Sequence, residues 1–279
     1  MHIQVNDLIA KGGQAEVFSC QYENKDYVVK QLKPDKQGYR WVEPYIMTRL
    51  QSPYITQGFI QLFSDGLYIY QPRARFDLKR FIRHFKAGTP ELLENIFKQC
   101  VEAVAFLHSK GFIHADIKPS NFLCYITRSN TEETNRTTTD SFTVKLNDFG
   151  LSTKYEWNHH CSIGTPVYRA PEVATKSWGP SIDVWGLGHV LYELLYQNSL
   201  FQLENLTEEM RHFKMSYPEF LESDLLLRDS PYHKWLFLCK RMLNPNPKTR
   251  ITLPEVCEIV NVPFQPYSRP FLADKQTRS

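Results

Sequence analysis

Oxygen-bearing side chains that could bind cations and accept a proton occur in two short runs of the sequence. The first run, 114–121, reads HADIKPSN and carries Asp116 and Asn121, and the second reads DFG and begins at Asp148. Phosphoryl transfer needs cations held by acidic ligands and a base that orients the attacking hydroxyl. We therefore predict that Asp116 accepts the hydroxyl proton and that Asn121 and Asp148 bind a metal ion.

A lysine and a glutamate nearer the start of the chain form a second candidate pair. Lys30 ends the strand-like run VVK, but exposed lysines on strands are common, so Lys30 alone indicates little. Glu43 lies on the apolar face of a predicted short helix, with Ile46, Met47 and Leu50 at the i, i+3, i+4, i+7 spacing. Because an unpaired carboxylate on that face would be costly, we expect an ion pair between Lys30 and Glu43.

The first third of the chain has the pattern of strands. Alternating runs over 16–32 and 59–70 predict two pairs of strands, which turn at the polar segments 23–26 and 64–66. The residues 71–73 then break the pattern and predict a connector.

The remainder of the chain has the pattern of helices. A 3.6-residue apolar period predicts a long helix over 93–107, and the segment 182–195 is apolar almost all round, which predicts a helix at the centre of a lobe. A polar, Thr-rich stretch between residues 125 and 141 predicts a loop. The pattern indicates a small β-rich lobe followed by a larger helical lobe.

These motifs, taken in chain order, resemble those of the eukaryotic protein kinase superfamily over roughly residues 3 to 262. HxDxKxxN, DFG and the APE tripeptide at 170–172 follow one another in the order of that family. The resemblance implies an α+β, two-lobed protein kinase fold, with a small β-rich N-lobe containing one helix and a larger α-helical C-lobe. It also implies an ATP- and Mg²⁺-dependent protein serine/threonine kinase. The implied single domain, 1–279, comprises an N-lobe over 1–70, a hinge over 71–75, a C-lobe over 76–262 and a tail over 263–279.

The resemblance gives further residues a role. Lys118 joins Asp116 as a catalytic residue, and its position is typical of Ser/Thr kinases rather than tyrosine kinases, as is that of Thr165. By the same resemblance, the run 114–121 is the catalytic loop, and Asp183 is expected to brace it. Arg250 is expected to pair with the glutamate of APE, Glu172.

The nucleotide is expected to bind between the first two strands. The run 10–17 reads AKGGQAEV and matches the kinase Gly-rich loop, GxGxxGxV, with alanine in place of two glycines. Taken alone, this run is explained at least as well by an ordinary hairpin turn. By alignment, Tyr70 is expected to be the gatekeeper residue. The residues expected to bind ATP are Ile9, Ala10, Lys11, Gly12, Gly13, Gln14, Ala15, Val17, Lys30 and Glu43.

One feature near the catalytic residues departs from the family pattern, and another in the activation segment allows two interpretations. Ala115 replaces the arginine that, in many kinases, binds a phosphorylated residue of the activation segment. We therefore expect that activity does not require phosphorylation of the segment 151–164, and loss of activity after phosphatase treatment would contradict this. His159, His160 and Cys161 in that segment could form a metal site, but solvated loop side chains explain them better.

A basic cluster follows the predicted hinge, with only Asp77 opposing it. In a kinase this region borders the substrate cleft, so an acidic or pre-phosphorylated protein substrate is one hypothesis. A solvated helix face is the alternative. The basic cluster consists of Arg73, Arg75, Lys79, Arg80, Arg83 and Lys86.

Two runs are similar to the cell division control protein 7 family, the catalytic half of the kinase that fires replication origins. They are 119–123 (PSNFL) and 164–176 (GTPVYRAPEVATK), and most kinases have a different residue at the position of Phe122. The similarity implies a role in the cell cycle and DNA replication, a nuclear location and a possible regulatory subunit. Ala115 and the missing long inserts depart from that family's pattern.

Three other classes of function stay open. A pseudokinase scaffold is suggested by Ala10, Ala15 and Ala115, although degenerate kinases usually lack one of the residues named above for catalysis. A small-molecule kinase is disfavoured by the run 164–172, which resembles the peptide-positioning segment of protein kinases. A nucleic-acid binder has only the basic cluster in its favour, without interleaved aromatic residues.

Composition limits the location and the partners. Apolar residues make up 42%, enough for a packed core, and a net charge of +3 is too small to imply nucleic-acid binding. The six cysteines are scattered and indicate reduced thiols of an intracellular protein. We find neither a signal sequence at the start nor an apolar run approaching the roughly 18 residues that span a bilayer. We expect an intracellular protein with no membrane or direct nucleic-acid partner.

Overall fold

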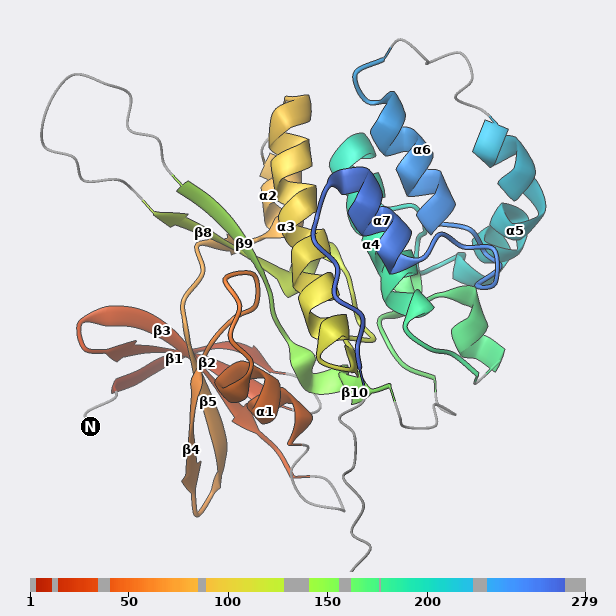
Figure 1. Cartoon of the computed structure of the whole chain (residues 1–279). Coiled ribbons are helices and arrows are strands. Elements are labelled where there is room, and N and C mark those ends of the chain that lie inside the picture. Colours follow the sequence, from red (N-terminus) through yellow and green to blue (C-terminus); the bar gives the residue numbers. More distant parts are fainter. Residues whose placement is uncertain are drawn as a thin grey trace, which may run out of the picture.

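The structure is a computed structural model, and its described part forms two lobes. The strand-rich lobe, red to orange in Figure 1, lies beside the helical lobe, yellow to blue. None of the helices in this part of the chain is long and apolar enough to cross a membrane. The described residues are 4–11, 15–34, 41–84, 89–127, 141–155, 162–175, 177–222 and 230–268.

An antiparallel five-stranded sheet forms most of the first lobe. Its strand order is β1-β2-β3-β5-β4. Glu23 and Asn24 alone make the turn between β2 and β3, and both have positive φ angles, of 49° and 57°, as a tight two-residue hairpin requires. The turn is therefore shorter than the predicted segment 23–26. The strands are β1 (Gln4–Lys11), β2 (Ala15–Tyr22), β3 (Lys25–Leu32), β4 (Phe59–Phe63) and β5 (Gly66–Pro72).

The end of β5 differs from the prediction. Gln71 and Pro72 pair with Val28 and Tyr27 of β3, so the connector does not begin at residue 71. Pairing between β4 and β5 ends at Tyr70, which leaves Pro72 with a strand on one side only. A proline, which has no N–H to donate, is tolerated at such an edge. The segment 73–75 is the connector, and the other predicted domain boundaries stay predictions.

One helix covers the sheet on the side of the second lobe. In α1 (Val42–Arg49), Glu43, Ile46 and Met47 are buried, as the apolar spacing predicted. Pro44 lies in the first turn, where a missing N–H breaks no helical hydrogen bond. Leu50 is the residue that ends the helix and is also buried.

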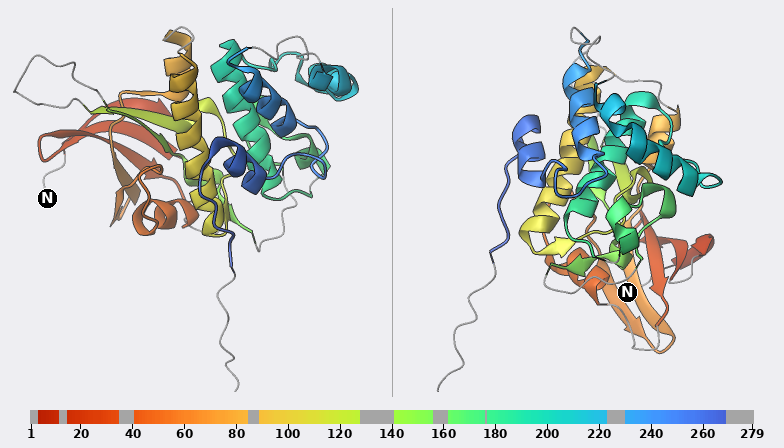
Figure 2. Two further views of the ribbon diagram at one scale, coloured as in Figure 1. Left: turned by 45° about the horizontal axis from the view of Figure 1, so that its top comes forward. Right: turned by 90° about the vertical axis from the view of Figure 1, so that its right-hand side faces the viewer.

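Two long helices form the centre of the second lobe. Both predicted helices are confirmed: α3 spans Pro90–Ser109 and α4 spans Ser181–Tyr196. Every residue from Ile182 to Leu191 is buried, as expected for a helix that is apolar all round. The views in Figure 2 show α3 and α4 side by side in the middle of the lobe. Around them lie α2 (Leu78–His84), α5 (Leu206–Glu222), α6 (His233–Met242) and α7 (Leu253–Val260).

Two small sheets join the lobes. β6 (Phe76–Asp77), β8 (Phe122–Thr127) and β9 (Ser141–Leu146) form one, and β7 (Phe112–Ile113) pairs with β10 (Thr153–Lys154) in the other. β9 ends two residues before Asp148, the first residue of the DFG run. The predicted Thr-rich loop falls largely on residues 128–140, outside the described residues.

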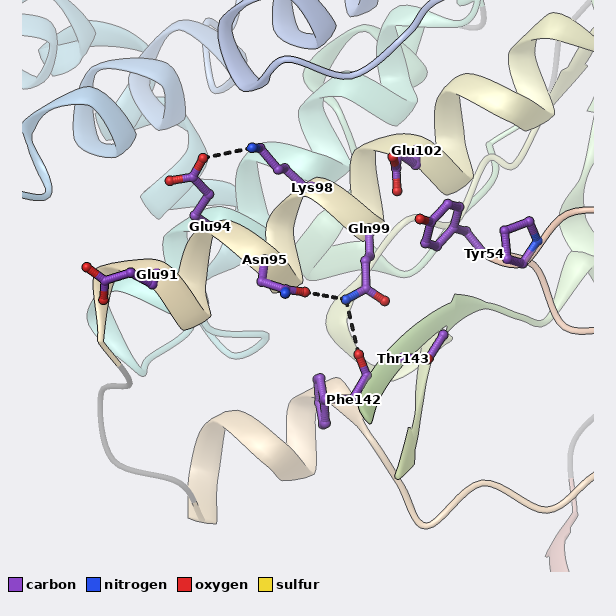
Figure 3. Close-up of a pocket in the computed structure, with 10 residues that line it drawn as sticks. Tyr54, Glu91, Glu94, Asn95, Lys98, Gln99, Glu102, Phe142 and Thr143 are labelled. Carbon is purple, nitrogen blue, oxygen red and sulfur yellow. Dashed lines mark hydrogen bonds and ion pairs between the residues drawn. The ribbon is translucent and has the colours of Figure 1, made fainter. Parts of the chain in front are cut away.

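Gln99 fixes β9 against α3. Its Nε2 donates to Asn95 Oδ1 at 2.6 Å and to the Phe142 carbonyl at 3.3 Å, and its Oε1 accepts from the Val144 N–H at 2.7 Å. Gln99, Asn95 and Phe142 line a surface groove, which Figure 3 shows together with an ion pair on α3. Neither Asp116 nor Asp148 lines this groove, so we assign it no catalytic role.

Candidate active site

Lys30 is the centre of an ion-pair cluster between the two lobes. Its Nζ lies 2.8 and 3.0 Å from the two carboxylate oxygens of Glu43, and 2.8 Å from Oδ1 of Asp148. The Glu43 side chain is only 4% exposed and that of Lys30 21%, so the pair is largely shielded from water. The predicted Lys30–Glu43 ion pair is confirmed, and Asp148 joins it from 118 residues further along the chain.

Charge compensation favours the ionised forms of Lys30 and Asp148. Burial lowers the pKa of the Lys30 ammonium, but the two carboxylates outweigh burial and raise this pKa overall. For Asp148, burial raises the pKa, and Lys30 outweighs it, so the pKa of Asp148 lies below its usual value. At neutral pH, Asp148 therefore carries the negative charge that a bound cation needs.

Asp116 is held by three donors. Its Oδ1 accepts from the Thr165 N–H at 2.7 Å, and its Oδ2 accepts from Lys118 Nζ at 2.7 Å and Asn121 Nδ2 at 3.2 Å. Lys118 also donates to Thr165 Oγ1 at 2.6 Å, which joins the catalytic loop to the activation segment. Burial raises the pKa of Asp116, but Lys118 and Thr165 outweigh burial, so the pKa lies below its usual value. Asp116 is thus an oriented anion able to accept a proton.

Asp183 braces the loop that carries Asp116, as the resemblance implied. Its Oδ2 accepts from the His114 N–H at 2.7 Å, and its Oδ1 from the Ala115 N–H at 2.9 Å. His108 Nε2 lies 2.8 Å from Oδ2. Ala115 has a φ angle of 66°, a left-handed conformation that is strained for a residue other than glycine. The buried carboxylate of Asp183 holds this strained turn in place.

Arg169 fixes the activation segment where it meets the catalytic loop, and the sequence did not predict this role. Its guanidinium donates to the carbonyls of Ile163 and Gly164 at 3.0 and 2.7 Å. Gly164 has a φ angle of 86°, and a Cβ there would lie 2.9 Å from the Ala115 carbonyl oxygen, so only glycine fits. These contacts position Thr165 next to Asp116.

The oxygen atoms of Asn121 and Asp148 fit a magnesium ion. Both side-chain hydrogen bonds of Asn121 to Asp116 are donated by its nitrogen, so its Oδ1 is directed away from Asp116. Lys30 binds Oδ1 of Asp148, which leaves Oδ2 for a cation. The Asn147 N–H donates to the Asn121 carbonyl at 2.8 Å and so joins the two candidate ligands through the backbone. Such oxygen ligands suit Mg²⁺.

The expected nucleotide loop is described only at its two ends. Ala10 pairs with Val17 and Lys11 with Glu16, so β1 and β2 approach the loop in register. Lys11 Nζ lies 3.0 Å from Glu16 Oε1. Ile9 is half exposed and Ala15 is buried. Gly12, Gly13 and Gln14 lie outside the described residues, as do His159, His160 and Cys161, and the roles predicted for them stay predictions.

The prediction that Tyr70 is the gatekeeper was wrong. Tyr70 pairs with Val29, the neighbour of Lys30, and therefore lies on the face of the sheet opposite Lys30. There it stacks on Phe59, with 4.9 Å between ring centroids. Gln71, one residue further along β5, alternates to the face of Lys30 and takes that place.

The basic cluster is not a uniform solvated face. Arg73, Arg75, Arg80 and Arg83 are exposed, whereas the Lys79 side chain is only 23% exposed and contacts Glu193 on α4. No local pattern could have predicted this contact, because the two residues lie 114 positions apart. Lys86 lies outside the described residues.

The known proteins and the family model that match this chain are all protein kinases. The family model described as "Protein kinase domain" matches residues 3–264. CBL-interacting protein kinase 10 of Oryza sativa subsp. japonica is 33% identical over 178 residues, which cover 60% of this chain and 34% of that protein. Serine/threonine-protein kinase PLK4 of Aedes aegypti is 28% identical over 274 residues, which cover 91% of this chain and 32% of that protein. The chain thus spans about a third of the length of these curated relatives.

Proposed function

Because the chain belongs to the protein kinase family, we propose that it transfers the γ-phosphate of ATP to serine and threonine hydroxyls of proteins. The observation that carries this proposal is the joint contact of Lys30 with Glu43 and Asp148. In protein kinases, a lysine–glutamate pair and the DFG aspartate must both be in place for transfer. Both are in place here, next to the oriented carboxylate of Asp116.

The residues have distinct roles in the proposed reaction. The substrate hydroxyl oxygen forms a bond to the γ-phosphorus, the bond from that phosphorus to the ADP oxygen breaks, and the hydroxyl proton passes to Asp116. Lys118, which bonds to Asp116 at 2.7 Å, orients its carboxylate. Asn121 and Asp148 would hold Mg²⁺, which when bound neutralises negative charge on the phosphates. Lys30 would bind the phosphates from the other side.

The test is phosphate transfer from Mg-ATP to a serine peptide by the wild type and by Asp148→Asn. The variant should lose at least a hundredfold in rate, since it loses the anionic oxygen that would bind the metal. Nucleotide binding by the wild type and by the variant is measured in parallel. A wild type that binds neither nucleotide nor metal would contradict the proposal and favour a scaffold, the alternative suggested by the alanines of the Gly-rich loop.

We also propose that the protein substrate is acidic near the phosphorylated residue. Arg80 and Arg83 are exposed on α2, which packs against the 3₁₀ turn Pro119–Asn121 of the catalytic loop. Positive charge at this edge would attract acidic side chains. Reversing both charges, with Arg80→Glu and Arg83→Glu, should raise the Michaelis constant for an acidic peptide by about three- to tenfold. An unchanged constant would remove the idea.

For the physiological role, we propose a kinase like the cell division control protein 7 family. The support is the similarity of the runs 119–123 and 164–176. The role would be the initiation of DNA replication, in the nucleus, and a regulatory subunit could be required. A helicase-type acidic serine peptide should be a better substrate than a generic basic protein, and a fluorescently tagged chain should enter the nucleus. Equal use of both substrates would contradict this proposal.

A further inference from the structure

A buried carboxylate at the end of α4 is compensated by a lysine from α2. The Glu193 side chain is 3% exposed, and its Oε1 accepts from the hydroxyls of Tyr168 and Ser199 at 2.8 and 3.1 Å. Lys79 Nζ lies 3.4 Å from Glu193 Oε2. The same ammonium donates to Ser199 Oγ at 3.1 Å and contacts the hydroxyl of Tyr168. The four side chains form one closed network, named here the Lys79–Glu193 lock.

Lys79 is the cation of this lock. His189, one helical turn before Glu193, packs edge-on against Tyr168 at 5.4 Å between ring centroids. Burial and the nearby Lys79 charge lower the pKa of His189 to about 3, so His189 is neutral. Among the residues that the structure describes, Lys79 is the cation bonded to Glu193. Removing it would leave an uncompensated negative charge.

The lock lies at the edge of the catalytic centre. Tyr168 ends the 3₁₀ turn Pro166–Tyr168, which follows Thr165 directly. Thr165 in turn bonds to Asp116 and Lys118. If the proposed function holds, the substrate residues that flank the phosphorylated hydroxyl lie beside this segment. A charge released from the lock would therefore act on the substrate.

Further cations lie just outside the lock. Arg83 is exposed one turn after Lys79 on α2. Burial and Glu193 raise the pKa of the Tyr168 hydroxyl, and the Arg83 charge partly offsets this rise. With Glu193 neutralised by Lys79, the net charge presented at this edge is positive.

We propose that Lys79 determines substrate specificity by neutralising Glu193, so that the kinase accepts acidic rather than basic residues beside the phosphorylated hydroxyl. This inference rests on the proposed kinase function. Without Lys79, the Glu193 carboxylate would attract a cationic substrate side chain and would repel an acidic one. Without the Glu193 charge, Lys79 would add its own charge to that of the exposed arginines.

The two partners of the lock can be changed separately, and the expected effects have opposite signs. Two peptides are compared that share one serine and differ only in having acidic or basic flanking residues. Lys79→Met should shift the preference, measured as the ratio of kcat/KM for the acidic peptide to that for the basic peptide, about five- to tenfold toward the basic peptide. Glu193→Gln should shift the ratio toward the acidic peptide. Damage to the fold would lower both rates and leave the ratio unchanged.

A matched control is available on α3. Lys98 pairs with Glu94 at 2.9 Å on the surface (Figure 3), and Lys98→Met should leave the ratio unchanged. The dissociation constants of the same peptides, measured by fluorescence anisotropy, test the lock even if no phosphate is transferred. A wild type that binds both peptides without transfer would count against the proposed function alone. Ratios that stay within about twofold of the wild type in both lock variants would overturn the lock.

Discussion

Asp116→Asn is expected to lower the rate of phosphate transfer by about a hundred- to ten-thousandfold, the usual contribution of a general base. An amide has one acceptor oxygen and cannot take a proton from the substrate hydroxyl at neutral pH. The Lys30 cluster does not include Asp116, so the affinity for nucleotide should be retained. Single-turnover transfer to a serine peptide, measured beside nucleotide binding, separates the two effects.

The variant also loses hydrogen bonds, and a control must separate this loss from the loss of the base. Asp65→Asn is matched in chemistry, since Asp65 accepts a 2.7 Å hydrogen bond from Tyr68 in an exposed turn of the strand-rich lobe. It should leave the rate within about twofold. A thermal melt shows whether Asp116→Asn is folded. A folded Asp116→Asn protein that keeps more than about a tenth of the wild-type rate would show that Asp116 is not the base.

The residues of the proposed catalytic centre could be selected from the sequence because each lies in a run whose local spacing fits the chemistry. Asp116 and Asn121 occur within one loop, and Glu43 was identified because a carboxylate on an apolar helix face needs a cation. The ion pair with Lys30 followed from that cost and is present in the structure. Local spacing, however, gave no reason to expect that Asp148 bonds to the same lysine.

The errors have a different origin, because they depend on which face of a sheet a residue occupies. Tyr70 and Gln71 are neighbours in the chain but lie on opposite faces of β5, and the pairing with β3 decides which of them faces Lys30. Local sequence patterns do not determine the register in which β5 pairs with β3. An alignment that is wrong by one residue therefore selects Tyr70, which is buried on the opposite face, in place of Gln71, which shares the face of Lys30.

Local sequence patterns also could not predict the Lys79–Glu193 lock. In sequence, Lys79 is one of six basic residues around a short helix, and nothing distinguishes it from its arginine neighbours. Only the packing of α2 against the ends of α4 and the activation segment brings Lys79 to Glu193 and Tyr168. The structure therefore divides the basic cluster, because the Lys79 cation is internal and the four arginines are exposed.

Arg250→Met is expected to lower the free energy of unfolding by about 3–5 kcal/mol, the cost of breaking a buried ion pair on one side. The Arg250 guanidinium binds both oxygens of Glu172, at 2.5 and 2.9 Å, and its Nη1 also donates to the Ser181 carbonyl at 2.9 Å. It lies 5.1 Å from the centroid of the Trp185 ring. Methionine can fill part of the volume but leaves the Glu172 charge buried without a cation. Urea unfolding, with the slope of the transition compared between variants, measures the change.

A second arginine–glutamate pair in the same lobe shows whether burial is the cause. Arg241 lies 3.5 Å from Glu255, and both side chains are more than a third exposed. Arg241→Met should therefore cost less than about 1 kcal/mol. Glu172→Gln added to Arg250→Met should restore part of the lost stability, because it removes the uncompensated charge. If Arg250→Met cost no more than Arg241→Met, burial would not make the ion pair between Arg250 and Glu172 more stabilising than the exposed pair.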